Sequence, residues 1–243
     1  MTLWQYALLF STAILGGGIA LLGDERFRRA LPVLLSFSGA YLLGIAALEL
    51  IPDVFGEGST TAGLWLLLGF FVQLLLEGLS QGVEHGHVHA HRGQGTGFAL
   101  GIMFGLGVHA FLEGLPLGAG AVVPAGHAPH VHDAHLLYGI ALHKLPAAFA
   151  LGLLLRGSGY SKGFVWTCLA IFGMMSPVGA VFAETLSINP VWRARILALV
   201  VGSFLHISTT ILFEADGSHR HGVSFVKLLI IVAGMGVAYL TVH

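Results

Sequence analysis

The sequence predicts an all-α membrane protein: a bundle of eight transmembrane helices with both termini on the extracellular or periplasmic side. Of its 243 residues, 56% are hydrophobic and only 9% are charged, whereas a soluble domain carries roughly 25% charged residues. A helix needs about 20 apolar residues to cross a bilayer. Eight stretches approach that length, at about 3–23, 31–51, 62–80, 98–121, 136–155, 163–185, 196–213 and 224–242.

The spans differ in regularity along the chain. No basic segment precedes the first apolar run, so we expect no cleavable signal peptide and a retained first span. The second span ends near Pro52, which favours a helix end. The sixth span is interrupted by Pro177 and Glu184. We expect a single transmembrane domain over residues 1–243, with a histidine-rich loop at about 81–97.

Basic residues between the spans predict the orientation, because cytoplasmic loops are enriched in lysine and arginine. With an external N-terminus, the outward loops hold only Arg193 and Arg195. The inward loops then hold Arg26, Arg28, Arg29, Arg92, Arg156, Lys162, Arg220 and Lys227. This imbalance predicts that both termini face out.

Ionisable residues within the fourth and fifth spans predict a cation site, because burying them is unfavourable unless they find partners. His109 and Glu113 are four residues apart and project from one helix face. His143 lies in the next span. Imidazole and carboxylate ligands suit zinc and other divalent first-row metals. Pro116 follows Glu113 and Pro146 follows His143. Because proline has no N–H to donate, each leaves a backbone carbonyl of its helix without its usual partner. The alternative is a histidine–carboxylate pair that only ties two helices together.

Lys144 is an unusual neighbour for a metal site. Successive helical residues are rotated by about 100°, so His143 can face a metal while Lys144 does not. The ammonium could pair with Glu113, or with Glu77 or Glu184 on another span. The alternative is a lysine that reaches towards the membrane interface.

These elements resemble the Zrt-/Irt-like (ZIP) family of divalent metal transporters. That family carries a His-x-x-Pro-Glu-Gly-like element on its fourth helix and a His-Glu-x-Pro-His-Glu-like element on its fifth. The matching segments are His109-Ala110-Phe111-Leu112-Glu113-Gly114 and His143-Lys144-Leu145-Pro146-Ala147-Ala148. Further matches are Ser176-Pro177-Val178-Gly179 on span six and Gly202-Ser203-Phe204-Leu205-His206 on span seven. Eight spans, external termini and the histidine-rich loop extend the resemblance over nearly the whole chain.

Departures from the family pattern imply a single-metal site. Many members hold two adjacent metals bridged by carboxylates. Here the resemblance keeps His109, Glu113 and His143 for the first metal, while the bridging carboxylate has become Ala147. At the positions where the family has polar or acidic ligands for the second metal, this sequence has Ala110, Lys144 and Ser176. We hypothesise that the Lys144 ammonium replaces the second metal as a tethered cation. Residual ligands would come from Glu49, Glu77 or His206.

Other polar clusters lie at the predicted ends of the bundle. Glu49 and Asp53 form either an acidic mouth that concentrates cations or a solvated helix end. The outer loop holds His127, His130, His132, Asp133 and His135, a candidate capture site. The inner loop holds His85, His87, His89 and His91, an alternating pattern suited to chelating zinc-like metals. Glu77, Glu214, Asp216, His219 and His221 fall towards the same inner side and suggest a release path.

The leading functional hypothesis is a carrier in the cell (inner or plasma) membrane that moves a divalent cation inward by alternating access. Zinc is the first expectation, and the ligand types also admit iron, manganese, cobalt, nickel and cadmium. We expect no enzymatic activity, prosthetic group or nucleic-acid partner; the net charge is −1, and a homodimer is compatible with the sequence. The lone Cys168 excludes a disulfide framework. The alternatives are an intramembrane metal-dependent hydrolase, although the His-Glu-x-x-His spacing is absent, and a non-transporting metal sensor.

Overall fold

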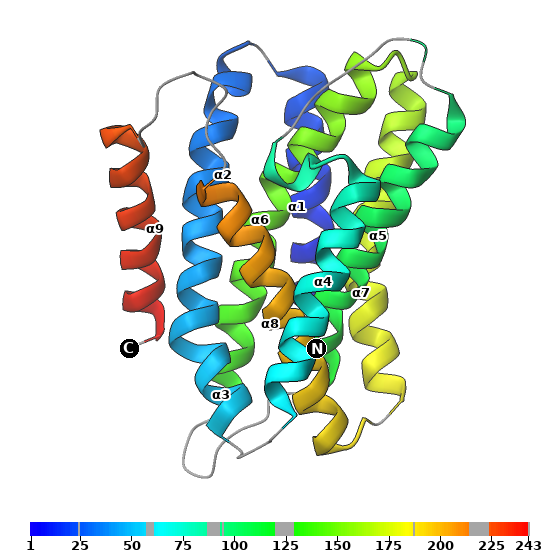
Figure 1. Cartoon of the computed structure of the whole chain (residues 1–243). Coiled ribbons are helices and arrows are strands. Elements are labelled where there is room, and N and C mark those ends of the chain that lie inside the picture. Colours follow the sequence, from blue (N-terminus) through cyan, green and yellow to red (C-terminus); the bar gives the residue numbers. More distant parts are fainter. Residues whose placement is uncertain are drawn as a thin grey trace.

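The computed structural model describes residues 1–23, 25–56, 61–86, 93, 95–119, 129–186, 188–213 and 224–242. Within these ranges every regular element is helical, and eight helices are long and apolar enough to cross a membrane (Figure 1). The elements are α1 (Leu3–Leu22), α2 (Glu25–Ile45), the π-helical turn η1 (Ala46–Leu50), α3 (Ile51–Gly56), α4 (Ala62–Ser80), the 3₁₀ turn η2 (Val83–His85), α5 (Thr96–Ala119), α6 (Pro129–Gly157), α7 (Lys162–Thr185), α8 (Pro190–Phe213) and α9 (Phe225–Val242). The predicted all-α bundle with eight spans is therefore confirmed.

Apolar side chains cover the outside of the bundle, while several polar ones are enclosed. On α4, Leu67, Phe71 and Leu75 recur every four residues and are exposed. The opposite face buries Gly69 and Gln73. A helix in water would bury the apolar stripe, whereas in a bilayer that stripe faces lipid and the polar groups turn inward.

The second span continues beyond Pro52, where the sequence predicts a helix end. The backbone widens into η1, and α3 then carries the helix to Gly56. Pro52 is the second residue of α3 and directly follows η1; a local π-helical adjustment lets a continuous membrane helix accommodate a proline, which has no N–H to donate. The predicted helix end at Pro52 is therefore wrong, because the helix continues through the π-helical turn and past the proline to Gly56. Pro177, which was expected to interrupt the sixth span, lies inside the continuous α7.

Four helix pairs make the most extensive contacts: α5 with α7, α1 with α6, α4 with α8 and α2 with α9. These pairs are related by a regular exchange of spans. If α1, α2–α3 and α4 exchange places with α7, α8 and α9, in that order, and α5 exchanges with α6, the same four pairs result. Each exchange relates helices that cross in opposite directions. The bundle therefore has the pairing expected of an inverted repeat, an architecture whose ligand sites lie near the middle of the membrane.

Glycine brings α5 and α7 into backbone contact. A Cβ atom added at Gly114 would lie 2.1 Å from the carbonyl oxygen of Ser176. Such small residues allow helices in membranes to approach closely. Because Gly114 follows Glu113, the close approach sets the Glu113 carboxylate beside Ser176.

We expect Gly114→Ala to destabilise the protein by about 1–3 kcal/mol, since the added methyl group overpacks a backbone contact. The melting temperature in detergent measures the effect. Gly78→Ala on α4 is the control, because no atom lies within 4 Å of a Cβ added there. Equal melting temperatures for the two variants would contradict the proposed role of the close approach.

Candidate metal centre

Five polar side chains from three helices meet inside the bundle. His109 and Glu113 come from α5, His143 and Lys144 from α6, and Ser176 from α7. Each of these residues is at most 2% exposed. The structure thus brings together the three predicted ligands and the predicted lysine in one enclosed cluster, which we call the central cluster.

Lys144 is bound to Glu113. Its ammonium nitrogen lies 2.8 Å from Glu113 Oε1 and 2.5 Å from Ser176 Oγ. The Ser176 hydroxyl donates to the same carboxylate oxygen at 2.7 Å. The Phe172 ring adds a cation–π contact, with its centroid 4.5 Å from the ammonium.

Of the partners left open by the sequence, Glu113 is the one that Lys144 contacts, whereas Glu184 contacts the Tyr6 hydroxyl. The alternative of a lysine reaching the membrane interface is wrong. Its side chain is fully buried, because the adjacent carboxylate and hydroxyl solvate the ammonium inside the protein.

The other side of the central cluster presents imidazole nitrogens. His109 Nε2 lies 3.5 Å from Glu113 Oε2 and makes no hydrogen bond within the described structure. Both ring nitrogens of His143 also lack hydrogen-bond partners among the described residues. The two rings face each other edge-on, with centroids 6.2 Å apart. Buried polar atoms without partners are rare, and an imidazole lone pair is a metal ligand.

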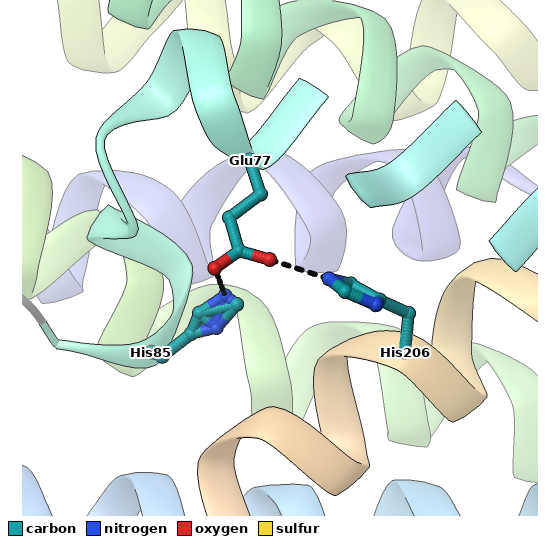
Figure 2. A group of neighbouring side chains, drawn as sticks. All are labelled: Glu77, His85 and His206. Atoms are coloured by element: carbon teal, nitrogen blue, oxygen red, sulfur yellow. Dashed lines mark hydrogen bonds and ion pairs between the residues drawn. The ribbon is translucent and has the colours of Figure 1, made fainter. Parts of the chain in front are cut away.

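A second cluster is formed by Glu77 on α4, His85 in η2 and His206 on α8 (Figure 2). Glu77 Oε2 contacts His206 Nε2, and Glu77 Oε1 lies 3.3 Å from His85 Nε2. One ligand atom from each residue lies within 4.8 Å of the others. Among the described residues, no other group of three histidine, cysteine or carboxylate residues meets this distance criterion. The ligand atoms of His109, Glu113 and His143 therefore lie too far apart to meet it.

The chain reversal after α4 brings His85 to Glu77. Gln81 and Gly82 adopt left-handed conformations, with φ of 59° and 69°, and Gly86 follows with φ of 85°. Glycine adopts such conformations without steric cost. The turn packs η2 against α4, α6 and α8, so His85 lies inside the bundle rather than in the loop predicted for it. Glu77 and His206 therefore join His85 and not the central cluster, for which they were predicted as possible residual ligands.

A chain of polar side chains connects the two regions. Ser203 Oγ lies 3.4 Å from His109 Nδ1 and donates to Gln73 Oε1 at 2.9 Å. Gln73 Nε2 donates to Glu84 Oε2 at 2.9 Å. Burial, reinforced by the nearby Glu77 and Glu113 carboxylates, raises the pKa of Glu84 to about 8, and the hydrogen bond from Gln73 opposes this shift.

Sequence reasoning missed Gln73 as a functional candidate, and it named Ser203 only as part of the span-seven match, with no role of its own. The available signal was an amide-bearing residue in the middle of the 62–80 span, since a polar group at that depth needs a partner.

Glu49 pairs with His135, whose Nδ1 lies 3.1 Å from Glu49 Oε2. Glu49 is buried, so the alternative of a solvated helix end is wrong for this residue. His135 was expected in the outer loop, but α6 begins at Pro129 and includes it. The predicted loop residues His87, His89, His91, His127, Glu214, Asp216, His219 and His221, and the side chains of His130, His132 and Asp133, lie outside the described parts of the structure.

Comparisons with known proteins agree on one family. A model of the ZIP zinc transporter family matches residues 80–241. Zinc transporter ZIP9 from Micropogonias undulatus is 29% identical over 174 residues, covering 67% of this chain and 54% of that protein. ZIP9-A from Xenopus laevis is 28% identical over 179 residues, covering 68% and 57%. Zinc transporter SLC39A7 from Rattus norvegicus is 32% identical over 117 residues, covering 37% and 25%.

The chain spans about half the length of the two ZIP9 relatives that it matches. The family match covers about two thirds of the chain and includes all five side chains of the central cluster, together with His85 and His206 of the second. The eight apolar helices found in the described parts of the chain make it a multi-pass membrane protein. The chain belongs to the ZIP zinc transporter family.

Proposed function

We propose that this protein carries divalent transition-metal cations, zinc first among them, across the membrane into the cytoplasm by alternating access. One observation carries the proposal: His109, Glu113 and His143 meet in an enclosed cluster in which His109 Nε2 and both ring nitrogens of His143 lack hydrogen-bond partners among the described residues. Two imidazoles and a carboxylate are a ligand set that zinc accepts. No step of this function requires an enzymatic reaction or a prosthetic group.

The direction of transport rests on the second cluster and the predicted orientation. Glu77 lies near the end of α4 that leads into residues 81–97, which the basic residues assign to the cytoplasmic side. A metal leaving the central cluster towards that side would meet Glu77, His85 and His206. We propose that these three residues form a release site, and that the loop histidines take up the metal beyond it. We further propose that the protein lies in the cell (inner or plasma) membrane.

The central cluster is proposed to bind one metal ion. The Lys144 ammonium occupies one side of the Glu113 carboxylate, through Oε1, and leaves Oε2 facing His109. A second cation beside Lys144 would be repelled by its charge. The test is elemental analysis of purified protein whose loop histidines have been replaced by serine and whose release site has been removed by His85→Ala and His206→Ala. One metal per chain is expected, and two per chain would contradict the single-metal proposal.

Metal uptake tests the function itself. Protein in sealed proteoliposomes is expected to accumulate zinc above empty liposomes, and a panel of manganese, iron, cobalt, nickel and cadmium gives the selectivity. Absence of uptake for every cation would refute the carrier.

The Glu113–Lys144 pair gives the metal-sensor alternative its specific support, because a tethered cation neutralises the site without metal. A sensor would bind zinc in equilibrium dialysis and transport none.

His206→Ala is expected to slow uptake by about tenfold, comparable to the loss when a residue supporting a metal site is removed. The half-saturating zinc concentration should change little, because the release site does not contact the metal on the outer side. The measurement is initial uptake rate against zinc concentration. Thr209→Val on the same helix is the control, since within the described structure the Thr209 hydroxyl donates to backbone carbonyls of α8 and to no other group. A raised half-saturating concentration with an unchanged maximal rate would contradict a release role.

A further inference from the structure

Gln73 and Ser203 take no part in the proposed metal coordination, yet both are buried beside it. Ser203 is 3% exposed and Gln73 is fully buried. They connect His109 to Glu84 through consecutive contacts of 3.4, 2.9 and 2.9 Å. A buried amide and hydroxyl inside a membrane bundle are unfavourable unless they are hydrogen-bonded. Their arrangement constrains where each hydrogen atom lies.

The donors can be followed from Glu84 towards His109. Glu84 accepts through Oε2, whether its carboxyl group is ionised or carries its proton on Oε1, and the Gln73 amide nitrogen is the donor. The Gln73 oxygen must then accept, and it does so from Ser203. A serine hydroxyl has one hydrogen and two lone pairs, so its hydrogen is committed to Gln73. Towards His109 the hydroxyl offers a lone pair.

A lone pair on Ser203 Oγ forms a hydrogen bond only with a protonated Nδ1. A neutral imidazole carries one hydrogen, so His109 with Nδ1–H has a bare Nε2. Nε2 is the nitrogen that lies 3.5 Å from Glu113 Oε2 and makes no hydrogen bond in the described structure. The chain of side chains therefore directs the imidazole lone pair to the carboxylate with which it would share a metal.

We propose that Ser203 and Gln73 are positioning residues that hold His109 in its Nδ1–H tautomer, so that Nε2 is available to the transported cation. The inference rests on the proposed function for the role of His109 as a ligand. Histidines that bind metals commonly donate their other N–H to a neighbouring acceptor, and losing that acceptor costs 10–100-fold in affinity. Here the acceptor is the Ser203 hydroxyl, whose own orientation is set by the Gln73 amide, two contacts away from His109.

Two substitutions have different predicted effects on the tautomer. In Gln73→Leu, the Ser203 hydroxyl loses its acceptor and becomes free to donate to Nδ1, so His109 should change to the Nε2–H tautomer. In Ser203→Ala, neither direction is enforced, so a mixture is expected. Ser203→Thr keeps the hydroxyl and should restore the native tautomer. A purely structural role for these residues gives no reason for the two substitutions to differ in their effect on the His109 tautomer.

The experiment is ¹⁵N solid-state NMR of histidine-labelled protein in bilayers without metal, with the His109 signals assigned by comparison with His109→Gln. Zinc affinity is measured on the same samples, whose folding is checked by their melting temperatures. We expect Nδ1–H in the wild type, Nε2–H in Gln73→Leu, and affinity reduced by about 10–100-fold in both Gln73→Leu and Ser203→Ala. Ser208→Ala is the matched control, a buried serine on α8 whose hydroxyl has no hydrogen-bond partner among the described residues.

Two results would overturn the inference: an Nε2–H tautomer in the wild type, or a tautomer unchanged in both Gln73→Leu and Ser203→Ala. Either leaves the proposed function intact, because it concerns only how His109 is held. Conversely, undiminished uptake in His109→Ala would refute the proposed role of His109 in transport. Because the tautomer is read without metal, the two failures are distinguishable.

Discussion

Lys144→Met is expected to destabilise the metal-free protein by about 3–5 kcal/mol, the cost of leaving a buried charge without its partner. Glu113 Oε1 would lose the ammonium at 2.8 Å, and only the Ser176 hydroxyl would continue to donate to that oxygen. Methionine fills a similar volume, so the change reports mainly on charge. The measurement is the melting temperature of the purified variant after treatment with a chelator.

Zinc should partly reverse this loss. If Lys144 acts as a tethered cation, a bound metal supplies positive charge to the same carboxylate, so zinc should raise the melting temperature more in Lys144→Met than in the wild type. The double variant Lys144→Met/Glu113→Gln removes both charges and should recover much of the stability without metal. Lys162→Met is the control for a lost lysine, because Lys162 is exposed at the start of α7.

Stability unchanged by Lys144→Met would contradict the tethered-cation hypothesis. It would mean that the Lys144–Glu113 contact makes no net contribution to the stability of the metal-free protein.

Hydropathy alone predicted the eight spans because a bilayer imposes one minimum length and one polarity on each crossing helix. The details that it missed depend on backbone geometry. Pro52 appeared to end the second span, but the π-helical turn Ala46–Leu50 shifts the hydrogen-bond register ahead of it. Sequence periodicity holds no information about that shift. The start of α6 was placed seven residues late, since Pro129 to His135 lack the hydropathy of a span.

The central cluster was predictable in part because the bilayer disfavours charged residues inside a span unless they find partners. Charged residues inside spans are few, so Glu113 was one of three partners considered for Lys144. Ser176, the third member of that contact, reaches Glu113 because α5 approaches α7 closely at Gly114. The residue pattern of a single helix does not predict which other helix it packs against. His85 was assigned to a loop because its neighbours are histidines and glycines, whereas the left-handed turn at Gln81 and Gly82 returns it to Glu77.

Glu113→Gln is expected to reduce zinc uptake by about 100-fold or more. The carboxylate is the only anionic member of the three proposed ligands, and removing one partner of a buried charged contact costs about 2–5 kcal/mol. A loss of 3 kcal/mol corresponds to roughly 150-fold in binding. Initial rates of zinc uptake into proteoliposomes, with equal amounts of reconstituted protein, measure the effect. Glu184→Gln is the matched control, since Glu184 lies at the end of α7 in contact with Tyr6.

The single substitution alone is ambiguous, because Lys144 would then be buried beside a neutral amide and the fold could weaken. Lys144→Met/Glu113→Gln removes that difficulty. With both charges gone the bundle no longer encloses an uncompensated ion, but the metal still lacks an anionic ligand. A folded double variant without uptake would assign the loss to the metal site, and His109→Ala should reproduce it, since His109 Nε2 lies beside the same carboxylate. Uptake retained in the folded double variant would place the transport route away from Glu113, and with it away from the central cluster.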